Sequence, residues 1–345
     1  MSKKYLKNII FTKSQLTGTY RYKDEFQFYP LDLDNAPRFN NINDIPICFE
    51  FYYEDKDVKM YNPFGSKTFD AMISETTAQT NKRNRILRLI SAITNYRFHL
   101  DSKTDVIWGL DATNPSDEMK SIPIFQAYAY PNIGQDLKIT DLTNYDVKGI
   151  ILLPPNEYYT YDPVDDRTKQ IKLPLNIDKI IDKYFELDDK TRLIIDSAIY
   201  QLCNSLDLFK NMKSLSFVSA VSSIETMLKI EFKTEKLEFE CKTCDTLKSS
   251  PRTCHRCGRP KWGIAEKYRE FLFKYIGESV ENRKLFMKIY SIRSKIVHTE
   301  YLMYNENVLD WEYGDKESEL DLNHLKAIQL ARISFVNWLL KYEAS

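Results

Sequence analysis

Short apolar runs broken by Pro, Asn and Asp recur through the first half of the chain, and this pattern predicts β-strands. The runs cover residues 45–53, 105–110, 122–130 and 149–153. One helix is predicted among them at 80–97, where Ile86, Ile90 and Ile93 recur at helical spacing. The segment 154–172 is rich in Pro, Asp and Tyr, so we predict that it is a linker.

From about residue 173 the apolar positions change to a helical period. Predicted helices cover 177–185, 190–209, 215–232, 264–276, 281–299 and 322–342. The second helix begins after Leu187-Asp188-Asp189, which is a good N-cap sequence. The predicted buried face of that helix comprises Leu193, Ile194, Ala198, Leu202 and Leu206. Several amphipathic helices of this length favour a bundle, so the predicted fold class is α+β, with a strand-rich N-terminal domain at 1–172 and an all-α helical bundle at 173–345.

Charge and composition narrow the classes of function. Lys plus Arg number 49, as do Asp plus Glu, so the formal net charge is zero. A surface that is basic throughout is therefore excluded, whereas one local basic patch for RNA is not. The chain has only 9 glycines and neither a G-x-G-x-x-G nor a Walker A pattern, which counts against a phosphate-binding loop. Because no apolar run is long enough to span a bilayer, we expect no membrane partner. Four of the six cysteines lie within 17 positions of one another, which suits a reducing compartment, so we expect a cytoplasmic location.

Four of the six cysteines form two C-x2-C pairs, Cys241 with Cys244 and Cys254 with Cys257. Each pair can hold one side of a tetrahedral ion, and the segment between them is long enough to bring both pairs to the same ion. We therefore predict one structural zinc site in an insert at about 238–262, with disulfides or free thiols as the alternative that we favour less. Four thiolates leave no open position for water, so this zinc is not predicted to be catalytic.

The zinc insert is also locally basic. Residues 241–262 contain six Lys or Arg residues and one Asp. One interpretation is that these side chains contact RNA phosphates. The other, which we slightly favour, is a solvated surface on a small module whose metal replaces a core.

The predicted helix at 281–299 contains Arg293 and His298, which are five residues apart. On a regular helix that spacing separates the two side chains by about 140°. A site that uses both residues therefore needs a helix end at the histidine or a second copy of the chain. An R-x4-H spacing alone is common by chance.

The surroundings of this pair are more informative. Residues 289–298, Ile-Tyr-Ser-Ile-Arg-Ser-Lys-Ile-Val-His, resemble the R-x4-6-H motif of HEPN domains, in the branch called ApeA-like. Residues 217–228, which include Glu225, are similar to an earlier helix of the same family. The resemblance covers about residues 175–343. It departs from the family pattern at Thr299, where glycine often follows the histidine.

The resemblance implies a dimeric helical bundle that acts as a metal-independent endoribonuclease. His298 would transfer a proton, because imidazole titrates near neutral pH. Arg293 would hold the phosphate and its developing charge. Glu225 would orient Arg293, and Ser294 would add a hydrogen bond. The RNA 2′-hydroxyl would be the nucleophile, giving a 2′,3′-cyclic phosphate and a 5′-hydroxyl.

Related domains often act in bacterial defence against phage through abortive infection, so the N-terminal domain is expected to sense a protein or phage-derived trigger. By analogy the homodimer would form through the HEPN bundle, with RNA as substrate. The main alternative is a non-catalytic RNA- or protein-binding adaptor that uses the basic zinc insert. A purely structural dimeric subunit of a larger defence complex is a further alternative.

Overall fold

The computed structural model describes residues 4–31, 45–54, 67–100, 107–110, 121–124, 138–144, 148–160, 170–232, 239–240, 244, 247–248, 263–299, 301–303 and 315–343. They form a mixed α and β protein in which an N-terminal sheet precedes a mostly helical C-terminal region. The chain divides into two compact units. The first comprises Met1–Leu87, Phe98–Leu152 and Asp165–Leu173, and the second comprises Arg88–Arg97, Leu153–Val164 and Pro174–Ser345.

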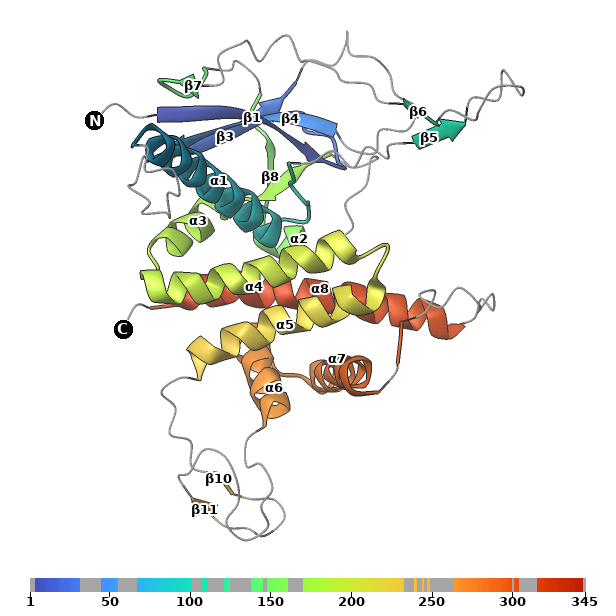
Figure 1. Ribbon diagram of the computed structural model, residues 1–345. Coiled ribbons are helices and arrows are strands. Elements are labelled where there is room, and N and C mark those ends of the chain that lie inside the picture. The colour runs from blue at the N-terminus through green and yellow to red at the C-terminus, as the bar shows by residue number, and fades with distance from the viewer. Residues whose placement is uncertain are drawn as a thin grey trace. The chain divides into compact units, whose positions relative to one another are not determined.

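An antiparallel sheet of five strands forms the first unit, in the order β2-β3-β4-β1-β7 (Figure 1). Its strands are β1 Lys4–Thr12, β2 Tyr20–Tyr22, β3 Phe26–Pro30, β4 Ile45–Tyr53 and β7 Lys138–Ile139. Strand β1 pairs with β4 over its whole length, from Lys4 opposite Tyr53 to Thr12 opposite Ile45. The prediction of a strand at 45–53 is confirmed.

One face of this sheet is aromatic, because alternate side chains along each strand point to the same side. The aromatic residues Phe26, Phe28, Phe49 and Phe51 are all buried. Helix α1 (Lys67–Ile93) begins in this unit, and its Glu75 accepts a hydrogen bond of 2.8 Å from the Tyr53 hydroxyl. The sequence prediction of 80–97 for this helix was wrong at both ends, since α1 begins at Lys67 and ends at Ile93. Its start was missed because residues 74–85 are polar apart from Ala78, so the apolar stripe could not be followed back to Lys67.

The opposite face of the sheet buries a carboxylate. Glu50 on β4 is fully buried, and its two oxygens accept hydrogen bonds from four donors. Two donors lie on β3, the Gln27 amide at 2.7 Å and the Tyr29 hydroxyl at 2.9 Å. The others are the backbone N–H and hydroxyl of Thr143, at 2.8 and 2.6 Å. Lys7 on β1 lies 3.6 Å from the same carboxylate, so the charge of Glu50 is both hydrogen-bonded and partly neutralised.

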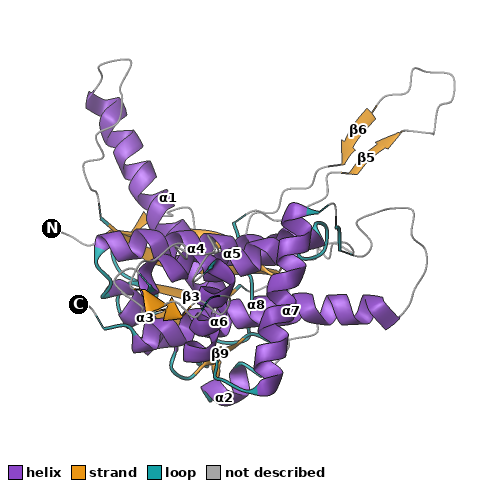
Figure 2. Ribbon diagram, turned by 90° about the horizontal axis from the view of Figure 1, so that it is seen from below, coloured by secondary structure: helices purple, strands orange, loops and turns teal. Residues whose placement is uncertain are grey.

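The second unit is built from helices. They are α2 Pro155–Tyr158, α3 Ile177–Phe185, α4 Asp189–Leu208, α5 Lys213–Glu231, α6 Ile264–Tyr275, α7 Val280–His298 and α8 Asp315–Lys341. Helix α5 is central: it packs against α4, α6, α7 and α8, and Figure 1 shows it between α4 and α8 on one side and α6 and α7 on the other. Seen from below, α7 runs across the direction of α8 (Figure 2).

The six predicted C-terminal helices are all present, and most bounds agree within two residues. Helix α8 is the exception, because it begins at Asp315 rather than at 322. Asp188, within the predicted N-cap sequence, caps α4 and accepts from the backbone N–H groups of Lys190 and Thr191. The buried face of α4 was partly wrong: Leu193 is 70% exposed, whereas Ile195 is buried. The run Leu-Ile-Ile at 193–195 left the position of the stripe ambiguous from sequence.

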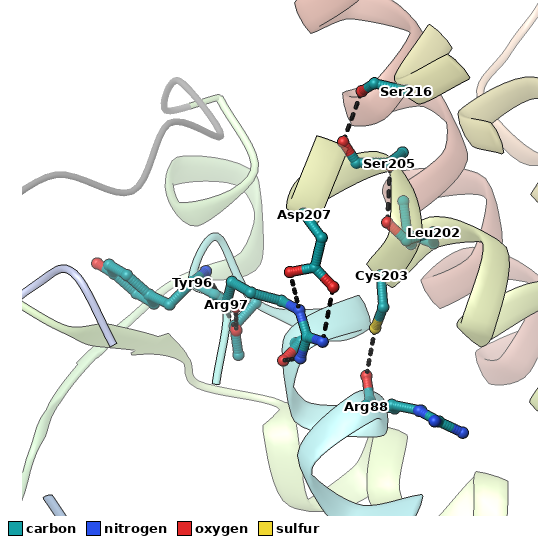
Figure 3. Close-up of polar contacts among 10 residues, drawn as sticks. Arg88, Tyr96, Arg97, Leu202, Cys203, Ser205, Asp207 and Ser216 are labelled. Atoms are coloured by element: carbon teal, nitrogen blue, oxygen red, sulfur yellow. Dashed lines mark hydrogen bonds and ion pairs between the residues drawn. The ribbon is translucent and has the colours of Figure 1, made fainter. Parts of the chain in front are cut away.

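The end of α1 belongs to the helical unit and is fixed there by an ion pair. Arg97 donates from Nε and Nη2 to the two carboxylate oxygens of Asp207, both at 2.9 Å (Figure 3). In the same view the Cys203 thiol donates to the backbone carbonyl of Arg88 at 3.5 Å. A bidentate pair of this kind fixes orientation as well as distance.

Part of the predicted linker also belongs to the helical unit. Tyr158 on α2 is buried, and its hydroxyl accepts a hydrogen bond of 2.8 Å from the backbone N–H of Asn95. The prediction of a linker at 154–172 was therefore wrong for α2, where aromatic burial outweighs a turn-like composition. Residues 161–169 of that segment lie outside the described residues.

Six further strands in the described part of the chain form three two-stranded sheets. They are β5 Ile107–Leu110 with β6 Ser121–Ile124, β8 Ile151–Leu153 with β9 Lys172–Pro174, and β10 Phe239–Glu240 with β11 Leu247–Lys248. Strands β5, β6 and β8 fall within predicted runs, except that β6 begins one residue earlier. Residues 105–106 and 125–130 of those runs lie outside the described residues.

Candidate active site

The candidate site is built where α5 and α7 pack against each other. Arg293 on α7 donates from Nη2 to Oε2 of Glu225 on α5, at 2.9 Å. The side chains are only 19% and 12% exposed, so the ion pair is largely shielded from water. Shielding makes the pair stronger than a surface pair and also makes either charge costly to leave alone. These two residues, 68 apart in sequence, are brought together as predicted.

The apolar stripes of the two helices place this pair. Helix α7 starts at the N-cap Ser279, whose hydroxyl accepts from the backbone N–H of Asn282. Its buried residues are Phe286, Ile289 and Ile292, and Arg293 follows directly at the border of that stripe. On α5 the border position is Glu225, next to the buried Ile224. Both charged groups thus lie at the edge of the same packed interface.

Two tyrosines surround the ion pair. Tyr290 is one turn before Arg293 on α7, and the guanidinium lies over its ring at 5.9 Å. The ring of Tyr268 on α6 lies 5.1 Å from that of Tyr290. Burial and then the nearby charge of Glu225 raise the pKa of Tyr290 to about 12. Burial also raises the pKa of Tyr268, so both hydroxyls stay protonated at neutral pH.

Sequence reasoning gave neither tyrosine a role. Tyr290 could have been found, because residues at i and i+3 share a helix face and Arg293 is at i+3. Tyr268 lies on another helix at an ordinary apolar position, so nothing in the sequence connects it with Glu225.

His298 and Ser294 are not joined to the ion pair. His298 is the last residue of α7 and is exposed, and Ser294 is half-buried beside Arg293. Within the described residues, no hydrogen bond links either of them to Arg293 or Glu225. The helix does end at the histidine, as one of the two sequence alternatives required.

Helix α7 is basic although the chain as a whole is neutral. It contains five Lys or Arg residues and one acidic residue. Arg283 pairs with Glu278 at 2.6 Å, and Lys288 pairs with Glu319. Lys284 and Lys295 are exposed. Three of the five cations thus have a carboxylate partner, which leaves these two exposed lysines to attract phosphate.

Of the predicted zinc ligands, Cys241, Cys254 and Cys257 lie outside the described residues. Cys244 is described, and it lies in the turn between the paired strands β10 and β11. Among the described residues, no group of three or more His, Cys, Asp or Glu side chains could hold a metal ion. The two remaining cysteines, Cys48 and Cys203, are buried.

Comparisons with protein-family models, curated proteins and solved structures found no match to this chain. Function is therefore argued from its own residues. None of the helices in the described part of the chain has the length and apolar character needed to cross a membrane.

Proposed function

We propose that this chain is a metal-independent endoribonuclease of the HEPN type, with Arg293 and His298 as its catalytic residues. The observation that carries the proposal is the shielded hydrogen bond of 2.9 Å between Arg293 and Glu225. It supports the role that the motif resemblance gives to these two residues, because a shielded arginine with one nitrogen fixed by a carboxylate is already oriented for a phosphate.

The chemistry is a transfer of the phosphate ester within the RNA. The 2′-oxygen forms a bond to phosphorus while the bond from phosphorus to the 5′-oxygen breaks. The proton lost by the 2′-hydroxyl and the proton gained by the 5′-oxygen pass through imidazole, the role of His298. Arg293 stabilises the negative charge that develops on the phosphate oxygens, and Ser294 donates a further hydrogen bond. The products are a 2′,3′-cyclic phosphate and a 5′-hydroxyl.

A homodimer fits the positions of these residues. His298 is exposed at the end of α7, five residues and about 140° of helix rotation beyond Arg293. A site completed by the His298 of a second copy removes that separation. The basic character of α7 supports RNA as the substrate.

The deciding experiment incubates purified protein with end-labelled RNA. We expect cleavage that persists in EDTA and falls by roughly 100-fold or more in Arg293→Ala and in His298→Ala. Arg283→Ala is the matched control, since it removes an exposed arginine from the same helix. Equal cleavage by wild type and all variants would indicate a contaminating nuclease and would refute the proposal. No cleavage by wild type on any RNA would favour the adaptor or structural-subunit alternatives.

A site shared between two copies has its own test. Arg293→Ala and His298→Ala chains, each inactive alone, are co-expressed with different tags, and the mixed dimer is purified. A shared site leaves one intact pair per mixed dimer, so cleavage returns. If the mixed dimer remains inactive, each chain uses its own Arg293 and His298.

A role in defence predicts toxicity. Expression of the wild-type chain in a bacterial host is expected to slow growth, and His298→Ala is expected to relieve that effect. Equal growth arrest by the wild-type chain and by His298→Ala would count against the nuclease. If the N-terminal unit recognises a trigger, toxicity would be seen only when the trigger is present.

We also propose that the insert binds structural zinc through Cys241, Cys244, Cys254 and Cys257. Strands β10 and β11 pair on either side of Cys244, and this pairing supports the proposal of a zinc knuckle. The ion would supply stability to a module too small for a core.

A further inference from the structure

Three buried polar atoms at the candidate site lack a hydrogen bond. They are Oε1 of Glu225, which Nη2 of Arg293 does not use, Nε of Arg293, and the hydroxyl of Tyr268. None has a partner among the residues that the structure describes. A buried acceptor and two buried donors without partners are costly. Their occurrence in one cluster indicates that Oε1 of Glu225 serves these donors, directly or through one water molecule.

Tyr290 connects the Tyr268 hydroxyl and the Glu225 carboxylate to Arg293. Its ring is 5.1 Å from that of Tyr268 and lies beneath the guanidinium of Arg293 at 5.9 Å. The charge of Glu225 acts on both hydroxyls, which have raised pKa values mainly because they are buried. The ion pair is therefore bordered by two aromatic hydroxyls, one on its own helix and one on α6.

We propose that Tyr268 and Tyr290 are positioning residues, which hold Oε1 of Glu225 through their hydroxyls so that Arg293 is fixed in one orientation for the phosphate. The inference rests on the proposed function, since the orientation matters for catalysis only if Arg293 binds the scissile phosphate. Glu225 fixes Nη2 of Arg293, and the Tyr290 ring fixes the plane of the guanidinium. Nε is buried, so the N–H groups of Nη1 are the ones left for the substrate.

The first test measures kcat and KM for RNA cleavage by Tyr290→Phe, Tyr268→Phe and Tyr290→Leu. Each Phe variant keeps the ring and loses only the hydroxyl. We expect kcat to fall about 10-fold in the Phe variants and about 100-fold in Tyr290→Leu, with KM changed less than about 2-fold, because misorientation of Arg293 affects the transition state more than binding. A change confined to KM, or no change in any variant, would overturn the proposal.

Tyr275→Phe is the matched control. Tyr275 also lies on α6, and its hydroxyl donates to the largely buried Glu231 at 2.8 Å. This variant removes the same kind of hydrogen bond from the same bundle but leaves Glu225 and Arg293 untouched. It should lower the thermal midpoint and keep kcat. If Tyr275→Phe loses as much kcat as Tyr268→Phe, general destabilisation of the bundle would explain the loss in both variants.

The second test does not need activity. With ¹³C-labelled tyrosine, the ring signals of Tyr268 and Tyr290 are assigned from the Phe variants and compared in wild type and Glu225→Gln. We expect both signals to shift in Glu225→Gln, while that of Tyr275 stays unchanged. If neither ring signal shifts in Glu225→Gln, the proposed contact of the two tyrosines with Glu225 is refuted. If wild type cleaves no RNA but these signals respond, the proposed nuclease fails while the hydrogen-bonded cluster stands.

Discussion

At the scale of single residues, His324 on α8 combines burial with an incomplete set of hydrogen bonds. It is 1% exposed, and its ring lies 4.7 Å from that of Phe209 and 6.0 Å from that of Phe217. Its Nε2 is 2.7 Å from the Ser216 hydroxyl, which itself donates to the Ser205 carbonyl (Figure 3 draws this serine pair). Nε2 therefore carries the proton. Nδ1 is buried without a partner among the described residues, so a second proton would have no acceptor.

This arrangement predicts acid sensitivity. Burial lowers the pKa of His324 to about 4, with a smaller opposing effect from Asp321. The unfolded chain, with a histidine pKa near 6.5, binds more protons between these values, so stability falls as pH drops through that window. Between pH 7 and pH 5 the expected loss is about 2 kcal/mol from this residue.

The measurement is urea unfolding of wild type and His324→Gln at both pH values. Glutamine keeps an N–H group to reach Ser216 but does not titrate. Wild type should lose about 2 kcal/mol more than the variant between pH 7 and pH 5. Parallel losses in the two proteins would show that His324 is not the titrating group.

At the scale of elements, helices with a clear apolar stripe were predicted from the sequence more completely than the strands were. Helices α3 and α5 follow clear apolar stripes, and the residues of α5 at helical spacing, Phe217, Val221, Ile224 and Leu228, are all buried. Strands β1 to β3 were not assigned individually, since their burial depends on partners elsewhere in the sheet. The Arg293–Glu225 pair was predicted only because a motif resemblance connected two helices. Tyr268 had no such signal.

The sheet illustrates why such contacts escape sequence reasoning. Glu50 lies in the apolar run 45–53, where one acidic residue would ordinarily face water. In the structure it joins β4 to β1, to β3 and to Thr143 in the segment after β7. Burial also raises the pKa of the neighbouring Cys48 to about 12, so that residue remains an unreactive thiol.

The network around Glu50 predicts a large effect of one substitution. Glu50→Gln removes the charge that Lys7 faces and sets an amide N–H₂ against donors, so we expect unfolding to become easier by roughly 2–4 kcal/mol. The matched control is Glu54→Gln, because Glu54 is exposed and accepts a long hydrogen bond of 3.3 Å from Tyr52. Chemical denaturation of the two variants gives the comparison. An effect of Glu50→Gln no larger than that of the control would refute the idea that this carboxylate organises the sheet.

At the scale of the whole molecule, charge is distributed unevenly. A net charge of zero excludes a uniformly basic surface, yet α7 alone carries five basic residues against one acidic residue. The predicted zinc insert is a second basic segment, and it lies in the chain between α5 and α6, two of the helices that border the candidate site. Its metal is proposed to stabilise that connection, whereas the proposed cleavage uses Arg293 and His298.

These separate roles predict different responses to metal removal. Elemental analysis of the purified protein should give about one zinc per chain, since four thiolates form one closed tetrahedral site. Cys244→Ser and Cys257→Ser should lose the metal, while Cys203→Ser, which alters a buried thiol outside the insert, should retain it.

Stripping the zinc should lower the thermal midpoint and expose the insert to protease, because metal binding and folding of such a module are coupled. Brief EDTA treatment that leaves zinc bound should not affect RNA cleavage. If both insert variants retain zinc, the ligand assignment is refuted. If stripping the zinc abolishes cleavage, zinc restores it, and neither stability nor protease sensitivity changes, the metal would instead belong to the chemistry.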